Sequence, residues 1–225
     1  MRLHFVVEGQ TEETFVRDIL APELGARGVF CDAHRITTGR RRGRIFRGGM
    51  LYYPHLQNDL ILWIKQDNAP DSWFTTMVDL YGMPEGFPGL DESRRKVDPF
   101  ERVRFLESKL QEDIGYRRFI PYIQLHEFES LLFAEPESFS VAFPEIGEGL
   151  TRLRSIRESV ASPELINDGP DTCPSRRICQ IFPQYSKTAS GPLIVKQIRL
   201  TTLRRECHHF NDWLALIESK AAAKG

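Results

Sequence analysis

The sequence of 225 residues lacks the features that mark membrane and secreted proteins. No apolar run approaches the roughly 20 residues that a membrane-spanning helix needs. The N-terminus also lacks a positively charged segment followed by an apolar stretch, because Glu8 interrupts its short apolar run. We therefore expect a cytoplasmic protein.

Cysteine is scarce, and other familiar motifs are missing. The sequence has four cysteines and no Cys-x-x-Cys pair, which predicts reduced thiols and argues against a structural zinc site. No Gly-x-x-x-x-Gly-Lys-Ser/Thr segment is present, so the phosphate-binding loop of P-loop nucleotide triphosphatases is excluded. His126 and Glu127 are adjacent, but no second histidine follows at the spacing that zinc proteases need.

The sequence also lacks an excess of charge of either sign, since its net charge is −1. Any binding of nucleic acid must therefore come from a local basic patch. One candidate is a glycine-flanked segment, interpreted as a loop, whose arginines would grip phosphates: Arg40, Arg41, Arg42, Arg44 and Arg47. A solvated loop and a docking surface for an acidic partner are the alternatives. Arg176 and Arg177 open a short helix, where they are either phosphate ligands or ordinary surface residues.

The pattern of apolar residues predicts an α/β fold with a mostly parallel sheet flanked by helices. Up to about residue 135, strands and helices alternate. Beyond it, strand signals vanish and a helical C-terminal portion, 136–225, is expected to pack on the core of residues 1–135. The expected strands are 3–7, 29–36, 73–78 and 118–125, and the expected helices are about 12–24, 51–65, 98–114, 136–143, 147–160, 174–182 and 192–217.

Acidic residues follow three of the expected strands, and they are Glu8, Asp79 and Glu127. The carboxyl ends of parallel strands lie at one edge of a sheet, where such folds bind ligands. Glu12 and Glu129 lie close by in sequence. Carboxylates brought together repel one another unless a cation compensates, and Mg²⁺ prefers oxygen ligands. A pair of such ions can also clamp the attacking and leaving oxygens of a phosphodiester.

Each carboxylate also has a simpler explanation when it is taken alone. Glu12 suits the positive end of a helix dipole, Asp79 suits a turn, and Glu129 suits a solvated helix surface. The occurrence of the set at three strand ends favours a metal site.

Residues 7–12, 78–82 and 126–133 resemble the uncharacterised bacterial DUF4276 family, which is similar to the TOPRIM domains of OLD-type nucleases, topoisomerases and primases. Four C-terminal segments also fit this resemblance: 166–168, 174–177, 185–187 and 204–210. The resemblance to DUF4276 covers nearly the whole chain. The resemblance to TOPRIM domains covers about residues 1–135, and it implies a TOPRIM-like sheet.

The resemblance to TOPRIM domains implies roles for several residues. Glu8 matches the catalytic glutamate after the first strand, and Glu12 matches the second glutamate of the OLD-type Glu-Gly-x-x-Glu motif. Asp79 matches the first aspartate of an Asp-x-Asp motif, whereas Tyr81 stands in place of the second. This departure leaves the number of metal ions open.

Further residues are candidates for completing the site by this resemblance. Glu127 or Glu129 supplies the missing ligand, and the sequence does not choose between them. Lys187 is a candidate, by its position, for the late lysine of OLD-type nucleases. His126 is either a general base or metal ligand, or a core histidine bonded to the backbone.

The implied function is that of a nuclease, a hydrolase of DNA or RNA that uses Mg²⁺ or Mn²⁺. Its catalytic residues would be Glu8, Asp79 and Lys187. Related TOPRIM proteins often act with an ABC- or AAA-type ATPase, commonly in defence against phage, so such a partner is implied, and a homodimer is left open. One alternative is a non-catalytic, degenerate TOPRIM subunit that binds nucleic acid or regulates an ATPase. Another is a primase-like nucleotidyl-transfer enzyme.

Overall fold

The structure is a computed structural model that describes all residues except 42–43, 48–51, 167–168, 170 and 224–225. For residues 38–41 and 44–47 it describes the backbone alone. The chain forms two compact units, and unit 1 consists of Met1–Ile123 with Ala215–Gly225, whereas unit 2 consists of Gln124–Leu214. The boundary lies after residue 123 rather than after the expected residue 135, because residues 128–134 pack with the helical segments that follow them.

Unit 1 contains the parallel sheet that the sequence predicts, so the α/β fold is confirmed. The four strands are β1 (Arg2–Val7), β2 (Phe30–Arg35), β5 (Ser72–Asp79) and β6 (Phe119–Ile120), and they pair in the order β2-β1-β5-β6. A short strand, β7 (Ile123–Gln124), also pairs with β5. Strands β1 and β5 are buried almost throughout, as expected for a parallel sheet covered by helices.

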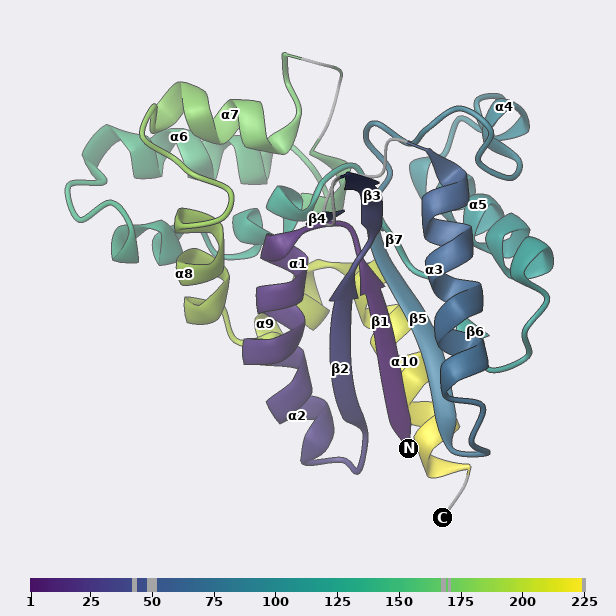
Figure 1. The fold of residues 1–225 in the computed structure, drawn as a ribbon. Helices are drawn as coiled ribbons and strands as arrows, with labels where there is room; N and C mark the ends of the chain where they lie inside the picture. The colour runs from purple at the N-terminus through teal and green to yellow at the C-terminus, as the bar shows by residue number, and fades with distance from the viewer. Residues whose placement is uncertain (42–43, 48–51, 167–168, 170, 224–225) are drawn as a thin grey trace. The chain divides into compact units, whose positions relative to one another are not determined.

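Helices flank this sheet (Figure 1), and they lie close to the expected positions. The first helical stretch comprises α1 (Gln10–Phe15), a π-helical segment η1 (Val16–Leu20) and α2 (Ala21–Gly25). The other helices of unit 1 are α3 (Tyr53–Gln66), α4 (Leu90–Ser93) and α5 (Pro99–Ile114).

The sequence predicts a helix cap at Thr11 and another at Asp98, which precedes a proline at the first helical position. These two predictions have different outcomes. Asp98 caps α5 as predicted, because its Oδ1 accepts the backbone N–H groups of Phe100 at 2.7 Å and Glu101 at 3.0 Å. The expected cap at Thr11 is wrong. Gly9 is the N-cap of α1, and Thr11 is buried within the first turn.

The arginine-rich segment is a β-hairpin, so its interpretation as a loop is wrong. Strands β3 (Thr37–Arg41) and β4 (Arg44–Arg47) form a separate antiparallel pair in which Arg41 lies opposite Arg44. The backbone N–H of Thr37 donates to Asp59 Oδ2 at 2.6 Å, which ties the base of the hairpin to α3. Arg42 lies outside the described residues.

Unit 2 is built around η2 (Phe128–Ala134), a 3₁₀ segment that is buried throughout. Six other helical segments of the unit pack against η2. They are η3 (Pro136–Val141), α6 (Gly147–Glu158), η4 (Pro163–Leu165), α7 (Pro174–Ile181), α8 (Ser190–Gln197) and α9 (Leu200–Glu206). Helix α10 (His208–Ala222) follows, and its last turns belong to unit 1.

Two of the long elements expected from the sequence are interrupted in the structure. The strand expected over 118–125 is divided into β6 and β7, because Pro121 lacks the N–H that a continuous strand would donate. The helix expected over 192–217 is three helices, α8, α9 and α10. Among the described residues, no helix is both long enough and apolar enough to cross a membrane.

Helix α10 begins on a buried carboxylate that comes from a distant part of the chain. Glu164 accepts the backbone N–H groups of His209 at 3.0 Å and Phe210 at 2.9 Å. Its side chain is fully buried, and burial raises the pKa of its carboxyl group. Glu164 therefore satisfies the N–H groups that the first turn of α10 leaves without helical partners.

We expect Glu164→Ala to lower the free energy of unfolding by about 2–4 kcal/mol, because two buried N–H groups lose their acceptor. Glu164→Gln keeps a carbonyl oxygen in the same place and should cost about 1 kcal/mol or less. Urea denaturation followed by circular dichroism measures both values. Equal losses in the two variants would contradict this role of Glu164.

Candidate functional site

The structure brings Glu8 and Asp79 together in unit 1. Glu8 is the first residue after β1, and Asp79 is the last residue of the neighbouring parallel strand β5. The backbone N–H of Asp79 donates to Glu8 Oε2 at 3.0 Å. Because the pairing aligns the carboxyl ends of the two strands, both side chains start from one edge of the sheet, as the sequence predicts.

Glu12 adds a third carboxylate at this edge. A Cβ atom built on Gly9 would lie only 3.0 Å from Glu12 Oε2, so the Glu12 carboxylate folds back over the glycine that follows Glu8. Glu12 is nevertheless buried, with 7% exposure. Tyr81, which stands in place of a second aspartate, is 40% exposed in the loop after β5.

A second charged cluster lies within unit 2, and Lys187 is at its centre. Lys187 Nζ donates to Glu127 Oε1 at 3.2 Å and to Glu129 Oε2 at 3.1 Å. The side chains of Glu127 and Glu129 are only 6% and 2% exposed, whereas that of Lys187 is 49% exposed. The lysine thus reaches from the surface to two buried carboxylates, Glu127 and Glu129.

Ser175 holds Glu127 at the start of helix α7. Its backbone N–H donates to Glu127 Oε2 at 2.9 Å, and its hydroxyl donates to Oε1 at 3.1 Å. The carboxylate therefore binds at the positive end of the helix dipole. The sequence leaves two alternatives for Arg176 and Arg177, phosphate binding at this helix terminus and an ordinary surface position. In the structure, Glu127 accepts the backbone N–H of Ser175 at the terminus.

The arginines themselves take other positions. Arg176 is exposed, and Arg177 Nε donates to the carbonyl of Thr172 at 2.6 Å. Phosphate binding by Arg176 and Arg177 stays a prediction.

Tyr185 contributes to the same cluster from the segment before Lys187. Its hydroxyl lies 3.4 Å from Glu129 Oε1 and donates to it, and the tyrosine is buried. Burial and the neighbouring Glu129 raise the pKa of the Tyr185 hydroxyl, so it stays a proton donor at neutral pH. Segments 126–133, 174–177 and 185–187, which are distant in sequence, thus converge on one cluster.

The surroundings of Glu127 and Glu129 shift the pKa values of the two carboxyl groups in opposite directions. Burial disfavours the anion of Glu127, but the Lys187 charge and the two Ser175 donors outweigh it and lower the pKa of the carboxyl group. For Glu129, burial is the largest effect and raises the pKa above its ordinary value, despite the attraction of Lys187. Two carboxyl groups with separated pKa values are a common arrangement in sites that move protons.

His126, which precedes Glu127 in the chain, adopts an unusual backbone conformation. Its φ is +67°, and it is the one non-glycine among the described residues with a positive φ. Histidine adopts this left-handed region more readily than most residues do. His126 lies in the short connection between β7 and η2, directly before Glu127 in the chain.

The donor chemistry of both clusters suits a hard divalent cation. All the candidate ligands are carboxylate oxygens, and Mg²⁺ in proteins is often held by one or two carboxylates together with water and substrate phosphates. In the part of the chain that the structure describes, no three or more histidine, cysteine, aspartate or glutamate side chains come together as a metal cage.

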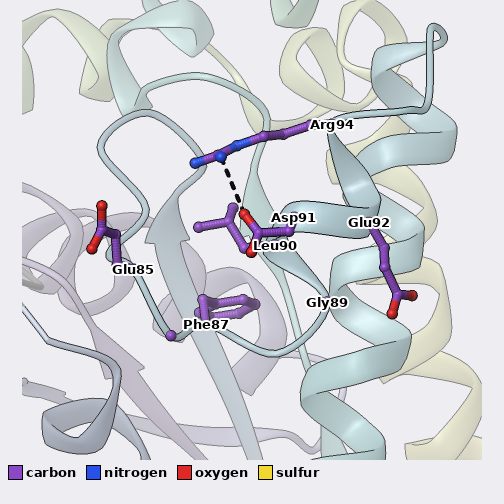
Figure 2. A pocket seen from close by; sticks show the side chains of 8 residues that line it. Glu85, Phe87, Gly89, Leu90, Asp91, Glu92 and Arg94 are labelled. Carbon is purple, nitrogen blue, oxygen red and sulfur yellow. Dashed lines mark ion pairs between the residues drawn. The ribbon is translucent and has the colours of Figure 1, made fainter.

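A pocket of about 480 Å³ lies elsewhere in unit 1, around α4 (Figure 2). Its polar lining includes Glu85, Asp91, Glu92 and Arg94. Asp91 and Arg94 form an ion pair at 3.1 Å, and both side chains are largely exposed, so the pair contributes little to stability. None of the predicted site residues lines this pocket, and we assign it no function.

Comparisons with known proteins give a family and a set of distant structural neighbours. The family described as a domain of unknown function, DUF4276, matches residues 7–218. Structures of the C-terminal region of the Xanthomonas campestris pv. campestris OLD protein are similar to the chain at 15% and 16% identity. They give TM-scores of 0.42 and 0.40, with coverage of 97% and 96% of this chain and 96% and 97% of theirs. No curated protein matches the chain.

Ser175→Ala tests the cluster in unit 2. We expect it to lower the free energy of unfolding by about 1 kcal/mol, because one of the two Ser175 bonds to Glu127 is lost. It should also raise the pKa of Glu127, because one donor that favours the anion disappears. Urea denaturation and a carboxyl ¹³C NMR titration measure the two effects. Ser140→Ala is the matched control, and an unchanged Glu127 pKa in Ser175→Ala would contradict the assignment.

Proposed function

The chain belongs to the DUF4276 family, and from this premise we propose that it is a divalent-metal-dependent nuclease that hydrolyses phosphodiester bonds in DNA or RNA. The single observation that carries the proposal is the cluster in which Lys187 binds Glu127 and Glu129. The resemblance of residues 7–12, 78–82 and 126–133 to the TOPRIM domains of nucleases supplies the reaction class.

The energetic cost of the cluster supports a functional role. Taking two carboxylates out of water is expensive, and apolar residues of similar volume often stabilise a fold as well or better than a buried ion pair. Shifted pKa values, such as the raised pKa of Glu129, also concentrate at functional sites. A charged cluster assembled from three distant segments is therefore better explained by chemistry than by stability.

The proposed roles follow from the residue types. Glu8, Glu12, Asp79, Glu127 and Glu129 would hold Mg²⁺ or Mn²⁺, which activates water and stabilises charge on a phosphate when it is bound. Lys187 steadies the negative charge that develops on the phosphate oxygens. Arg40, Arg41, Arg42, Arg44 and Arg47 bind the nucleic-acid backbone, and Arg176 and Arg177 add to this contact.

The proposed setting is a complex with an ABC- or AAA-type ATPase in defence against phage. This part of the proposal is supported by the sequence resemblance alone. It predicts that an ATPase partner, or a second copy of the chain, regulates when the nuclease acts.

The second candidate is a non-catalytic TOPRIM-like subunit, and Tyr81 is the observation in its favour. Tyr81 stands where the related nucleases carry a second aspartate, and phenol is a poor ligand for Mg²⁺ compared with carboxylate. Such a subunit would bind nucleic acid or an ATPase without cleaving a substrate.

We expect the purified protein to cleave plasmid DNA or single-stranded RNA in Mn²⁺. We expect Glu8→Ala and Glu127→Gln each to lower the cleavage rate by about 10²-fold or more, because the loss of one group that stabilises charge in a transition state has an effect of this size. Gel electrophoresis of the products against time measures the rates. The matched controls are Glu23→Ala and Glu145→Gln, because both side chains are exposed on the same two units.

Full activity in Glu8→Ala and Glu127→Gln would contradict the proposed site. If the wild type cleaves neither substrate and binds Mn²⁺ with no measurable affinity, with or without nucleic acid, the non-catalytic subunit is supported instead.

A further inference from the structure

We infer that the Lys187 ammonium and a divalent cation compete for the Glu127–Glu129 pair, so that Lys187 is the chain's own counter-ion, which a metal displaces when it binds. The inference rests on the proposed function and deepens it, because it concerns how the same site takes up its metal. It assigns Lys187 a role in the metal-free protein as well as at the substrate.

The charges in unit 2 show why the pair needs a cation. Glu127 and Glu129 are buried, and their mutual repulsion acts in a medium that screens charge poorly. Ser175 and Tyr185 donate hydrogen bonds to the pair but carry no net charge. Lys187 brings a full positive charge to both carboxylates, at 3.2 Å and 3.1 Å.

The cluster divides into a fixed part and an exchangeable part. Ser175 holds Glu127 and Tyr185 holds Glu129, and these bonds do not involve the lysine. Lys187 is half exposed and carries its charge on a flexible four-carbon stem, so it can turn to solvent without moving the backbone. The carboxylates therefore stay in place when the ammonium leaves.

The oxygens that Lys187 binds are suitable for a metal. Glu127 Oε1 and Glu129 Oε2 accept its two hydrogen bonds, and carboxylate oxygens of this kind are the ligands that Mg²⁺ and Mn²⁺ prefer. Exchange of an ammonium for a divalent cation changes the summed charge of the cluster from −1 to zero. The released Lys187 then carries its positive charge at the entrance to the site, where a phosphate can bind it.

Isothermal titration of Mn²⁺ into the full chain tests the competition. We expect Lys187→Met, which keeps the aliphatic stem, to bind Mn²⁺ about tenfold or more tightly than the wild type, because a like charge beside the site is gone. Lys187→Arg keeps the charge and should bind Mn²⁺ within about threefold of the wild type. Equal or weaker binding by Lys187→Met would overturn the inference.

A second measurement uses the wild type and does not depend on how a variant folds. The rate of acetylation of Lys187 by an N-hydroxysuccinimide ester is followed by mass spectrometry with and without Mg²⁺. We expect Mg²⁺ to increase the rate at Lys187 several-fold, because the ammonium is released from its two carboxylates, and to leave the exposed Lys196 unchanged. An unchanged rate at Lys187 in saturating Mg²⁺ would overturn the inference.

The outcomes separate this inference from the proposed nuclease. Tighter Mn²⁺ binding by Lys187→Met, together with no cleavage by the wild type, supports the competition and contradicts the nuclease. Cleavage by the wild type, together with unchanged Mn²⁺ affinity in Lys187→Met, overturns the competition alone. Absence of Mn²⁺ binding in both proteins overturns the competition, and it also contradicts a metal site at Glu127 and Glu129.

Discussion

The burial of two carboxylates side by side is the constraint on which the arrangement of unit 2 depends. A buried carboxylate without partners is costly by several kcal/mol, and a second one beside it adds repulsion. Unit 2 offsets this cost with the Lys187 ammonium, the N-terminus of α7 and the Tyr185 hydroxyl. These partners come from separate segments of the chain. Helix α7 and residues 185–187 must therefore both pack close to η2, because η2 contains Glu129 and begins directly after Glu127. The 3₁₀ segment η2 is accordingly buried throughout and packs against most of the unit.

In unit 1, the acidic residues are positioned mainly by the pairing of strands. Parallel pairing of β1 with β5 is sufficient to bring Glu8 and Asp79 to one edge of the sheet, and a backbone N–H binds the Glu8 carboxylate there. The absence of a side chain at Gly9 leaves room for the Glu12 carboxylate. Backbone geometry thus positions the carboxylates of unit 1, whereas hydrogen bonds between residues distant in sequence position those of unit 2.

Local signals in the sequence predicted the elements of unit 1 well. Continuous apolar runs gave β1 and β5, and the Asp98-Pro99 pair gave the start of α5. Long-range contacts were beyond such signals. The role of Ser175 depends on Glu127, 48 residues away, and the role of Glu164 depends on the start of α10. The β3–β4 hairpin was not predicted because its many arginines leave no alternation of apolar and polar residues that would indicate a strand. In the structure, Arg41 and Arg44 are paired across the two strands. The proline before Ser175 marked a helix start, but nothing in the sequence indicated that a glutamate would occupy that terminus.

The claim that the Glu127–Lys187–Glu129 cluster serves chemistry rather than stability can be tested by replacing its Glu129–Lys187 ion pair with apolar groups. The most direct measurement compares the double variant Glu129→Leu/Lys187→Met with the wild type in two assays, the free energy of unfolding and Mn²⁺-dependent cleavage of nucleic acid. The account predicts a protein that is as stable as the wild type or more so, since apolar replacements of buried ion pairs are often neutral or stabilising, and that has no cleavage activity. A double variant that loses several kcal/mol of stability but cleaves at the rate of the wild type would contradict it.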